Sequence, residues 1–260
     1  MHPLDHDKFT ERDRYDARAR ELLQRNNVEF LERSGAVAVP EMLRRPYLVY
    51  EDLIRKSAKS GSCALDVCCG SGLFSLIAAQ TGAAVAACDI AEHNLALARR
   101  RAEHAGYDLT TFVADAERLP VADHSYDVVT CAGSLSYLEI DRFVAEVRRV
   151  LKPGGWFVCV DSLNHNPIYR FNRYVQFWRG QRTRSTLIRM PTLATLRTLE
   201  TSFVSSETTF HGTISFMGPL LSPLLGSTRT AQLLDRVDSG PRSFKRWAFK
   251  FVFRGARDGS

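Results

Sequence analysis

The 260-residue sequence contains no run of 18 apolar residues, so we expect no segment of it to cross a membrane. Its first five residues lack the basic and apolar regions of a secretory signal peptide. The 6 cysteines include no Cys-x-x-Cys pair, and most of them fall inside expected strands, where reduced cysteines behave as small hydrophobic residues. These absences predict a cytoplasmic protein without a bound metal.

The overall composition is that of an ordinary globular protein. Apolar residues make up 45% of the chain and charged residues 25%, and the formal net charge is +6. The length suits one domain with added segments and is sufficient to bury a full core. The basic excess is local and matches no recognised nucleic-acid module, so we do not expect a nucleic-acid partner.

The most informative segment runs from Ala64 to Gly72. An apolar stretch contains Asp66, passes through the turn Gly70-Ser71-Gly72 and continues into a helical pattern. Such a turn exposes backbone N–H groups at the start of a helix, where they can hold a small polar ligand. The two glycines allow a positive φ or a close approach that a Cβ would obstruct.

A second apolar stretch, residues 85–90, ends in the carboxylate of Asp89, 19 residues beyond Gly70. A carboxylate at this place can accept hydrogen bonds from both ribose hydroxyls of an adenosine-containing ligand. NAD and S-adenosylmethionine both contain that ribose. A dinucleotide fingerprint requires a third glycine three residues after Gly72, where this chain has Ser75. The pattern therefore favours S-adenosylmethionine.

Two later segments complete an ordered set of four motifs: residues 112–120 followed by 126–132, and residues 150–158 with their Lys-Pro-Gly-Gly turn. With this set, the chain over roughly residues 45–162 resembles the class I S-adenosylmethionine-dependent methyltransferases, in the small-molecule branch that includes quinone and sugar methyltransferases. The resemblance implies an S-adenosylmethionine cofactor that lies across the carboxyl ends of parallel strands.

The resemblance also implies roles for individual residues. Asp89 would bind the ribose hydroxyls, Asp115 the adenine amino group, and Ala116 an adenine ring nitrogen through its backbone. The expected cofactor-binding set is Asp66, Cys68, Gly70, Gly72, Asp89, Ile90, Asp115, Ala116, Ala132 and Gly133. Members of the family usually have glycine where this chain has Cys68, and we expect a negative φ there. Adjacent cysteines chelate poorly, so Cys68 and Cys69 are interpreted as small buried residues and not as a metal or redox site.

The periodicities predict an α/β fold: a doubly wound, mostly parallel Rossmann-like sheet with a terminal antiparallel hairpin, added N-terminal helices and a lid insertion. Expected helices cover 9–33, 46–57, 73–81, 92–105 and 140–151, and expected strands cover 63–68, 84–89, 110–114, 126–131, 155–161, 201–211 and 246–254. We divide the chain into an N-terminal helical cap (1–60), a cofactor-binding core (61–162), a basic-aromatic substrate lid (163–200) and closing strands (201–260). The last part contains a helical insertion (213–241), interpreted as part of a lid or as a homodimer surface.

The segment from residue 162 to residue 199 contains seven arginines, no acidic residue and several interleaved aromatic residues. One interpretation is a helix that packs its apolar face on the sheet and leaves its arginines in water; that face would hold Ile168, Phe171, Val175 and Trp178. A second is an anion-recognising lid in which Arg170 and Arg173 bind a phosphorylated acceptor. A third is a peripheral contact with an anionic membrane.

Candidates for catalysis are few. His165 follows the fifth expected strand and is a candidate base, and Tyr137 follows the fourth. Tyr15, Tyr47 and Tyr50 are candidates to close over the cofactor, although ordinary core packing is the favoured interpretation of each. The function predicted is methyl transfer to oxygen, less favourably to nitrogen, of a small-molecule or glycan-like acceptor with or without a phosphate. The alternatives are methylation of an aromatic or quinone metabolite, and a membrane-associated cofactor-binding protein without turnover.

Overall fold

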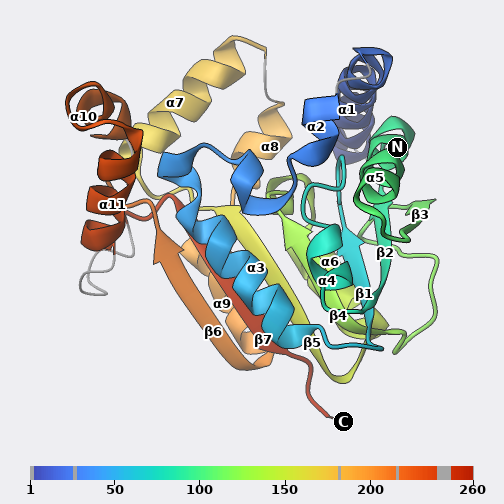
Figure 1. Ribbon diagram of the computed structural model, residues 1–260. Helices are drawn as coiled ribbons and strands as arrows, with labels where there is room; N and C mark the ends of the chain where they lie inside the picture. The colour runs from blue at the N-terminus through green and yellow to red at the C-terminus, as the bar shows by residue number, and fades with distance from the viewer. Residues whose placement is uncertain (1–2, 26–27, 181–182, 215–216, 239–246, 260) are drawn as a thin grey trace.

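The computed structural model describes residues 3–25, 28–180, 183–214, 217–238 and 247–259. A seven-stranded sheet with the order β3-β2-β1-β4-β5-β7-β6 forms its centre (Figure 1). The strands are β1 (Cys63–Val67), β2 (Ala84–Asp89), β3 (Thr110–Val113), β4 (Tyr126–Ala132), β5 (Leu151–Ser162), β6 (Val204–His211) and β7 (Lys250–Ala256). Neighbours among β1 to β5 pair in parallel, whereas β7 is antiparallel to both β5 and β6. The predicted doubly wound sheet with a terminal antiparallel hairpin is confirmed.

Helices lie on both faces of the sheet and above one of its edges. The α-helices are α1 (Pro3–Arg25), α2 (Val28–Glu32), α3 (Arg45–Ser57), α4 (Leu76–Ala79), α5 (Glu92–Ala105), α6 (Ile140–Val150), α7 (Pro167–Trp178), α8 (Arg184–Ile188), α9 (Leu193–Ser202), α10 (Gly218–Leu225) and α11 (Ser227–Asp238). Three short 3-10 helices are η1 (Gly35–Ala38), η2 (Glu41–Leu43) and η3 (Leu135–Tyr137). None of the helices in the described ranges has both the length and the apolar character needed to cross a bilayer.

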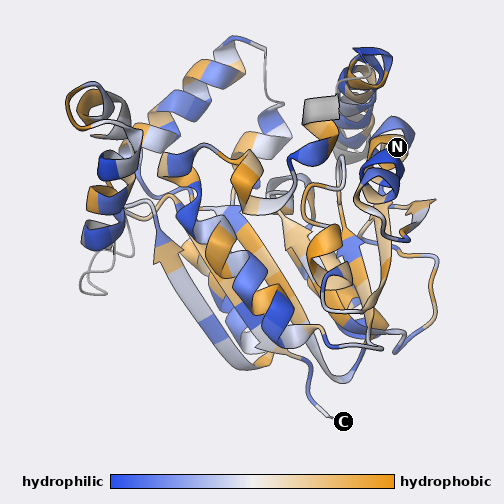
Figure 2. Cartoon of the chain, in the orientation of Figure 1, coloured by the Kyte–Doolittle hydropathy of each residue, from blue (hydrophilic) through white to orange (hydrophobic). Residues whose placement is uncertain are grey.

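The central strands are apolar on both sides because helices cover both faces of the sheet (Figure 2). On one face, Val129 and Phe157 pack with Phe143 of α6 and with residues of α9. On the other face, Val128 and Val158 pack with residues of α3 and α4, among them Ile54. Alternate residues of each strand thus serve two separate cores, which holds the strand ends in fixed positions.

The parallel strands all end at the same edge of the sheet, and α1, α2, α7 and α8 gather above that edge (Figure 1). In open α/β sheets ligands bind outside the carboxyl ends of the strands. The fold therefore indicates a functional site at this edge of the sheet.

Several element boundaries differ from the sequence-based expectation. The helix expected over 9–33 is two helices, α1 and α2, and the helix expected over 73–81 is only the short α4. The strand expected from residue 201 begins at Val204, because α9, started by a capping box at Thr192, continues through Ser202. The last strand is shifted to Lys250–Ala256, and Arg246 lies outside the described residues.

Candidate active site

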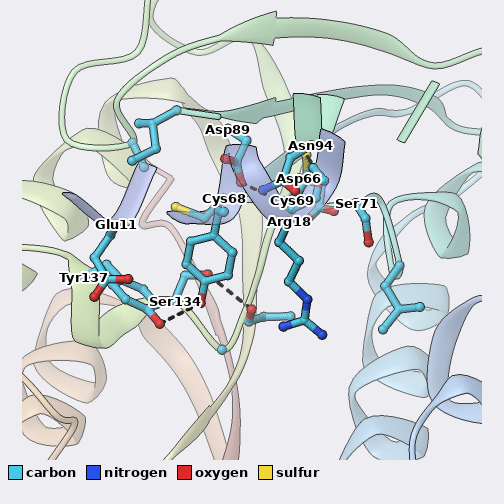
Figure 3. Close-up of a pocket in the computed structure, with 18 of the residues that line it drawn as sticks. Glu11, Arg18, Asp66, Cys68, Cys69, Ser71, Asp89, Asn94, Ser134 and Tyr137 are labelled. Carbon is cyan, nitrogen blue, oxygen red and sulfur yellow. Dashed lines mark hydrogen bonds between the residues drawn. The ribbon is translucent and has the colours of Figure 1, made fainter. Parts of the chain in front are cut away.

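A cavity of about 420 Å³ opens at the carboxyl ends of β1, β2 and β4, beneath α1 and α8 (Figure 3). In Figure 3, Asp66, Asp89 and Asn94 lie on one side of this cavity, and Glu11, Ser134 and Tyr137 lie on the other. Of the residues predicted to bind cofactor or to act in catalysis, those in its lining are Asp66, Cys68, Gly70, Asp89, Ile90, Asp115, Ala116, Ala132, Gly133 and Tyr137. Gly72, His165, Arg170 and Arg173 are not in the lining.

The buried carboxylate of Asp66 is held by two hydroxyl groups at the end of β1. Thr130 Oγ1 donates to its Oδ1 at 2.9 Å and Ser75 Oγ donates to its Oδ2 at 2.6 Å. Burial raises the pKa of Asp66 to about 6, although both hydroxyl groups lower it. Asp66 is therefore a fixed hydrogen-bond acceptor at the edge of the cavity, and its pKa lies close to physiological pH.

In the loop after β1, every second residue has a left-handed backbone conformation. The φ angle is 53° at Cys68, 53° at Gly70 and 73° at Gly72. The expectation of a negative φ at Cys68 is wrong: the side chain occupies a conformation that glycine normally adopts. Gly72 serves helix packing, because a Cβ there would lie 2.7 Å from the Cβ of Ala98 on α5. Its role is to let α5 approach the loop closely.

Asp89 ties this loop to the end of β2. Its carboxylate accepts from Gly70 N at 2.8 Å and from Ala91 N at 2.9 Å. The side chain of Asn94 also bonds to this carboxylate, which has about four lone-pair sites, so at least one site can still accept a bond from a ligand. Burial raises the pKa of Asp89 and the backbone bonds oppose that shift. This geometry suits a carboxylate with two roles: it fixes the loop, and it lines the cavity.

At the end of β3, the Asp115 carboxylate is paired with a lysine from α1. Lys8 Nζ lies 2.9 Å from Asp115 Oδ2 and 2.7 Å from Glu117 Oε1. Burial alone would lower the pKa of Lys8, but its bonds to Glu117 and Asp115 raise it overall. The lysine thus closes the predicted adenine end of the cavity from above.

Two further contacts hold α1 over the cavity. The hydroxyl oxygens of Tyr15 and Tyr137 lie 2.7 Å apart, and their rings meet edge to face. Asp16 accepts from the backbone N–H of His93, at the start of α5, at 2.8 Å, and its other oxygen lies 2.8 Å from Nδ1 of the same residue. The expectation that N-terminal tyrosines close over the site has support at Tyr15 and Tyr47, which line the cavity, whereas Tyr50 is buried in the core.

A group of polar residues that the sequence did not reveal lies at the end of the cavity next to Tyr137. Glu11 is buried; it forms an ion pair with Arg14, and its Oε1 has no hydrogen-bond partner among the described residues. Arg189, the residue directly after α8, pairs with Glu139 and also donates to the backbone carbonyl of Tyr137. Ser134, Ser185 and Thr186 are also part of the lining. The only signal in the sequence was the high density of charge on α1.

The predicted base and the two predicted substrate arginines have other surroundings. His165 is exposed, and its Nε2 accepts from the backbone N–H of Leu193 at 2.9 Å, at the start of α9. Arg170 is exposed on α7. Arg173 is buried; it donates to the Leu163 carbonyl at 3.1 Å and lies over the ring of Phe249. The cavity therefore provides no support for the predicted roles of these residues.

The interpretation that α7 packs its apolar face on the sheet and leaves its arginines in water is wrong. Phe171 and Trp178 are exposed, whereas Arg173 is buried. The basic residues near the C-terminus are also engaged with aromatic rings: Lys250 lies over Tyr47, and Arg254 over Trp156. Periodicity correctly grouped the residues of α7 into faces, but the tertiary structure turned the helix the other way.

Comparisons with known proteins agree with this geometry. Residues 65–159 match the family described as a methyltransferase domain. The chain is 38% identical over 122 residues to a demethylmenaquinone methyltransferase of Symbiobacterium thermophilum, covering 45% of this chain and 48% of the relative. It is 36% identical over 118 residues to a ubiquinone biosynthesis O-methyltransferase of Roseobacter denitrificans, covering 45% and 47%. The chain spans about half the length of these curated relatives.

Solved structures share the fold at low identity. A putative sarcosine dimethylglycine methyltransferase from Galdieria sulphuraria has a TM-score of 0.57 at 17% identity, covering 83% of this chain and 88% of that one. Geranyl diphosphate C-methyltransferase from Streptomyces coelicolor A3(2), solved with S-adenosyl-L-homocysteine, has a TM-score of 0.56 at 16% identity, covering 83% and 80%. The motifs, the strand order and these matches lead to one conclusion: residues 65–159 form a methyltransferase domain, and the sheet has the Rossmann-like methyltransferase fold.

Proposed function

We propose that this protein binds S-adenosylmethionine in the cavity and transfers its methyl group to a small aromatic acceptor of the quinol type. The observation that carries the proposal is a row of carboxylates at or just beyond the ends of neighbouring strands, Asp66, Asp89 and Asp115, which line a single cavity. At the end opposite Asp66 and Asp89, the cavity holds a buried carboxylate and a pair of tyrosines (Figure 3). The end with Asp66 and Asp89 suits the cofactor and the opposite end suits the acceptor, the two molecules that a methyl transfer must bring together.

The shape of the cavity supports an adenosine-containing cofactor. A Cβ built on Gly70 or Gly133 meets no atom within 4 Å, and both residues are part of the lining. A side chain at either position would therefore occupy space inside the cavity, as expected where a ligand approaches the backbone closely. A volume of about 420 Å³ lies within the range of small-molecule sites.

When bound, S-adenosylmethionine supplies an activated methyl group on a positively charged sulfur. This chain then has two tasks: to align the acceptor and to exclude water. The bonds from Lys8 and Tyr15 keep α1 over the cavity and serve the second task. The carboxylates of Asp66 and Asp89 favour a positively charged ligand at that end of the cavity.

For the acceptor, we propose that Glu11 takes up the proton of a phenolic hydroxyl through Oε1, while the hydroxyl of Tyr137 orients the acceptor. Both residues line the cavity, and Glu11 Oε1 is buried without a hydrogen-bond partner among the described residues. The name of one curated relative, an O-methyltransferase of ubiquinone biosynthesis, is consistent with a phenolic hydroxyl. A phosphorylated glycan has less support, because Arg170 and Arg173 lie outside the lining and Arg189 is paired with Glu139.

Isothermal titration with S-adenosylhomocysteine, and methyl transfer from labelled S-adenosylmethionine to short-chain benzoquinols and naphthoquinols, test the proposal. We expect binding of the cofactor product and labelled quinol, with transfer reduced at least tenfold by Glu11→Gln. Glu21→Gln changes an exposed carboxylate on the same helix and should leave transfer unchanged. Cofactor binding without transfer to any phenol would overturn the acceptor, and tighter binding of NAD would overturn the cofactor.

A further inference from the structure

We infer that the outer surface of α7, together with the neighbouring α8, docks on an anionic lipid bilayer. Four large side chains, Ile168, Phe171, Tyr174 and Trp178, follow one another at helical spacing along α7, and we call them the α7 stripe. All four are exposed, with 66% of Phe171 and 77% of Trp178 accessible. Large apolar and aromatic side chains that are exposed in one row mark a surface that a partner covers.

The fold keeps the α7 stripe turned outward by fastening the opposite side of the helix. Tyr169 stacks on Phe249 with ring centres 3.9 Å apart, and the buried Arg173 donates to the Leu163 carbonyl. At the first turn, the fully buried Asn166 caps the helix and donates to the Trp247 carbonyl at 2.8 Å. Rotating the stripe toward the sheet would break these contacts, so its exposure is a property of the packed state.

The exposed surface continues onto α8, which also lines the active site. Ile188 on this short helix is 72% exposed, whereas Ser185 and Thr186 are buried and face the cavity. The projecting α7 and the adjacent α8 both stand above the edge of the sheet at which the cavity opens (Figure 1). A bilayer on this surface would therefore lie next to the acceptor end of the cavity.

The charge of residues 162–199 indicates which kind of partner the α7 stripe contacts. Residues 162–199 contain seven arginines and no acidic residue, and Arg170, Arg179 and Arg184 are exposed around the stripe. Two copies of the chain would bring like charges together at this surface, which disfavours a homodimer through it. Aromatic rings between arginines on one helix match the headgroup region of an anionic membrane, where rings enter the boundary and guanidinium groups meet phosphates.

Co-sedimentation with phosphatidylcholine vesicles, with and without 30% phosphatidylglycerol, tests this inference without acceptor or cofactor. We expect binding to the anionic vesicles and little to the neutral ones. Arg170→Gln with Arg179→Gln should weaken it roughly 30-fold, at about 1 kcal/mol per charge. Phe171→Ser with Trp178→Ser should abolish binding with an unchanged unfolding midpoint, because all the changed side chains are exposed.

Val113→Ser is the matched control. Val113 is 55% exposed on the edge strand β3, away from α7, so its replacement should leave vesicle binding intact. Equal binding to neutral and anionic vesicles, or the same loss in the control, would overturn the inference. So would a self-association, detected by sedimentation velocity, that the Phe171 and Trp178 changes remove. Because vesicle binding needs no methyl transfer, its outcome is independent of the proposed function.

Discussion

The hydroxyl oxygens of Tyr15 and Tyr137 lie 2.7 Å apart although 122 residues separate them in the chain. Tyr15 belongs to α1 and Tyr137 ends η3, immediately after the fourth strand. The pair therefore couples the helix that covers the cavity to the wall at which the acceptor is proposed to bind. Tyr15 is expected only to hold α1 in place, whereas Tyr137 is also proposed to orient the acceptor. These two roles can be measured separately.

Replacing either tyrosine by phenylalanine removes the bond between α1 and η3, at a cost of about 1 kcal/mol in the free energy of unfolding. We expect the double variant to lose less stability than the sum of the single variants, because both remove the same bond. In methyl transfer, Tyr137→Phe should lower kcat/KM for the acceptor more than Tyr15→Phe does. Equal kinetic losses would indicate that the pair acts only by holding α1.

The Asp89 carboxylate is predicted to bind the cofactor ribose while it holds Gly70 and Ala91. Asp89→Ala should weaken S-adenosylhomocysteine binding more than 100-fold, since two charge-assisted bonds contribute about 1.5–3 kcal/mol each. Asp89→Asn keeps one acceptor oxygen and should lose less. Calorimetry on both variants measures the difference; unchanged affinity in Asp89→Ala would place the ribose elsewhere.

Asp115 has two roles to separate: its ion pair with Lys8 and its predicted bond to adenine. Asp115→Ala should weaken cofactor binding more than Asp115→Asn, because the amide oxygen can still accept from the adenine amino group. Glu117→Gln is the control, because it weakens the second ion pair of Lys8 and leaves Asp115 in place. If Glu117→Gln costs as much affinity as Asp115→Asn, closure of α1 explains the effect without an adenine contact.

The raised pKa of Asp66 predicts a dependence of stability on pH. Between its ordinary value of 3.8 and about 6, the folded protein holds a proton that the unfolded chain has released. The free energy of unfolding therefore falls as the pH rises through this window, by up to about 3 kcal/mol from this group. Asp66→Asn cannot titrate, so urea unfolding from pH 4 to pH 7 should show a flatter profile in the variant. Parallel profiles would contradict the assignment.

Cys68 has a positive φ, which favours glycine over any residue with a Cβ. Cys68→Gly should keep the free energy of unfolding within about 1 kcal/mol of the wild type, because relief of backbone strain offsets the added freedom of the unfolded chain. Cys68→Val should be clearly less stable, since a β-branched side chain tolerates this conformation poorly. Chemical unfolding of both variants tests this order, and a valine variant as stable as the glycine variant would refute it.

The sequence by itself determined the sheet and the end of the cavity at which the cofactor is predicted to bind. Apolar strands that alternate with helical patterns dictate a doubly wound sheet, and parallel strands of such a sheet end at one edge. Asp66, Gly70, Asp89 and Asp115 each lie directly at or after a strand end, so their convergence follows from local signals alone. Local boundaries were less accurate, as at residues 201–202, where the capped helix α9 continues in place of the expected strand.

Only the tertiary structure decided three features: that α1 covers the cavity, which residues form the proposed acceptor end, and which face of α7 turns outward. The contact of Lys8 with Asp115 and that of Tyr15 with Tyr137 join residues 107 and 122 positions apart, and no local pattern encodes such pairs. The spacing of Phe171 and Trp178 shows that they share a face, but periodicity does not say which face turns inward. That choice depends on Arg173, Tyr169 and Asn166 finding partners just after β5 and just before β7, and the free energy of those distant contacts outweighs burial of the aromatic face.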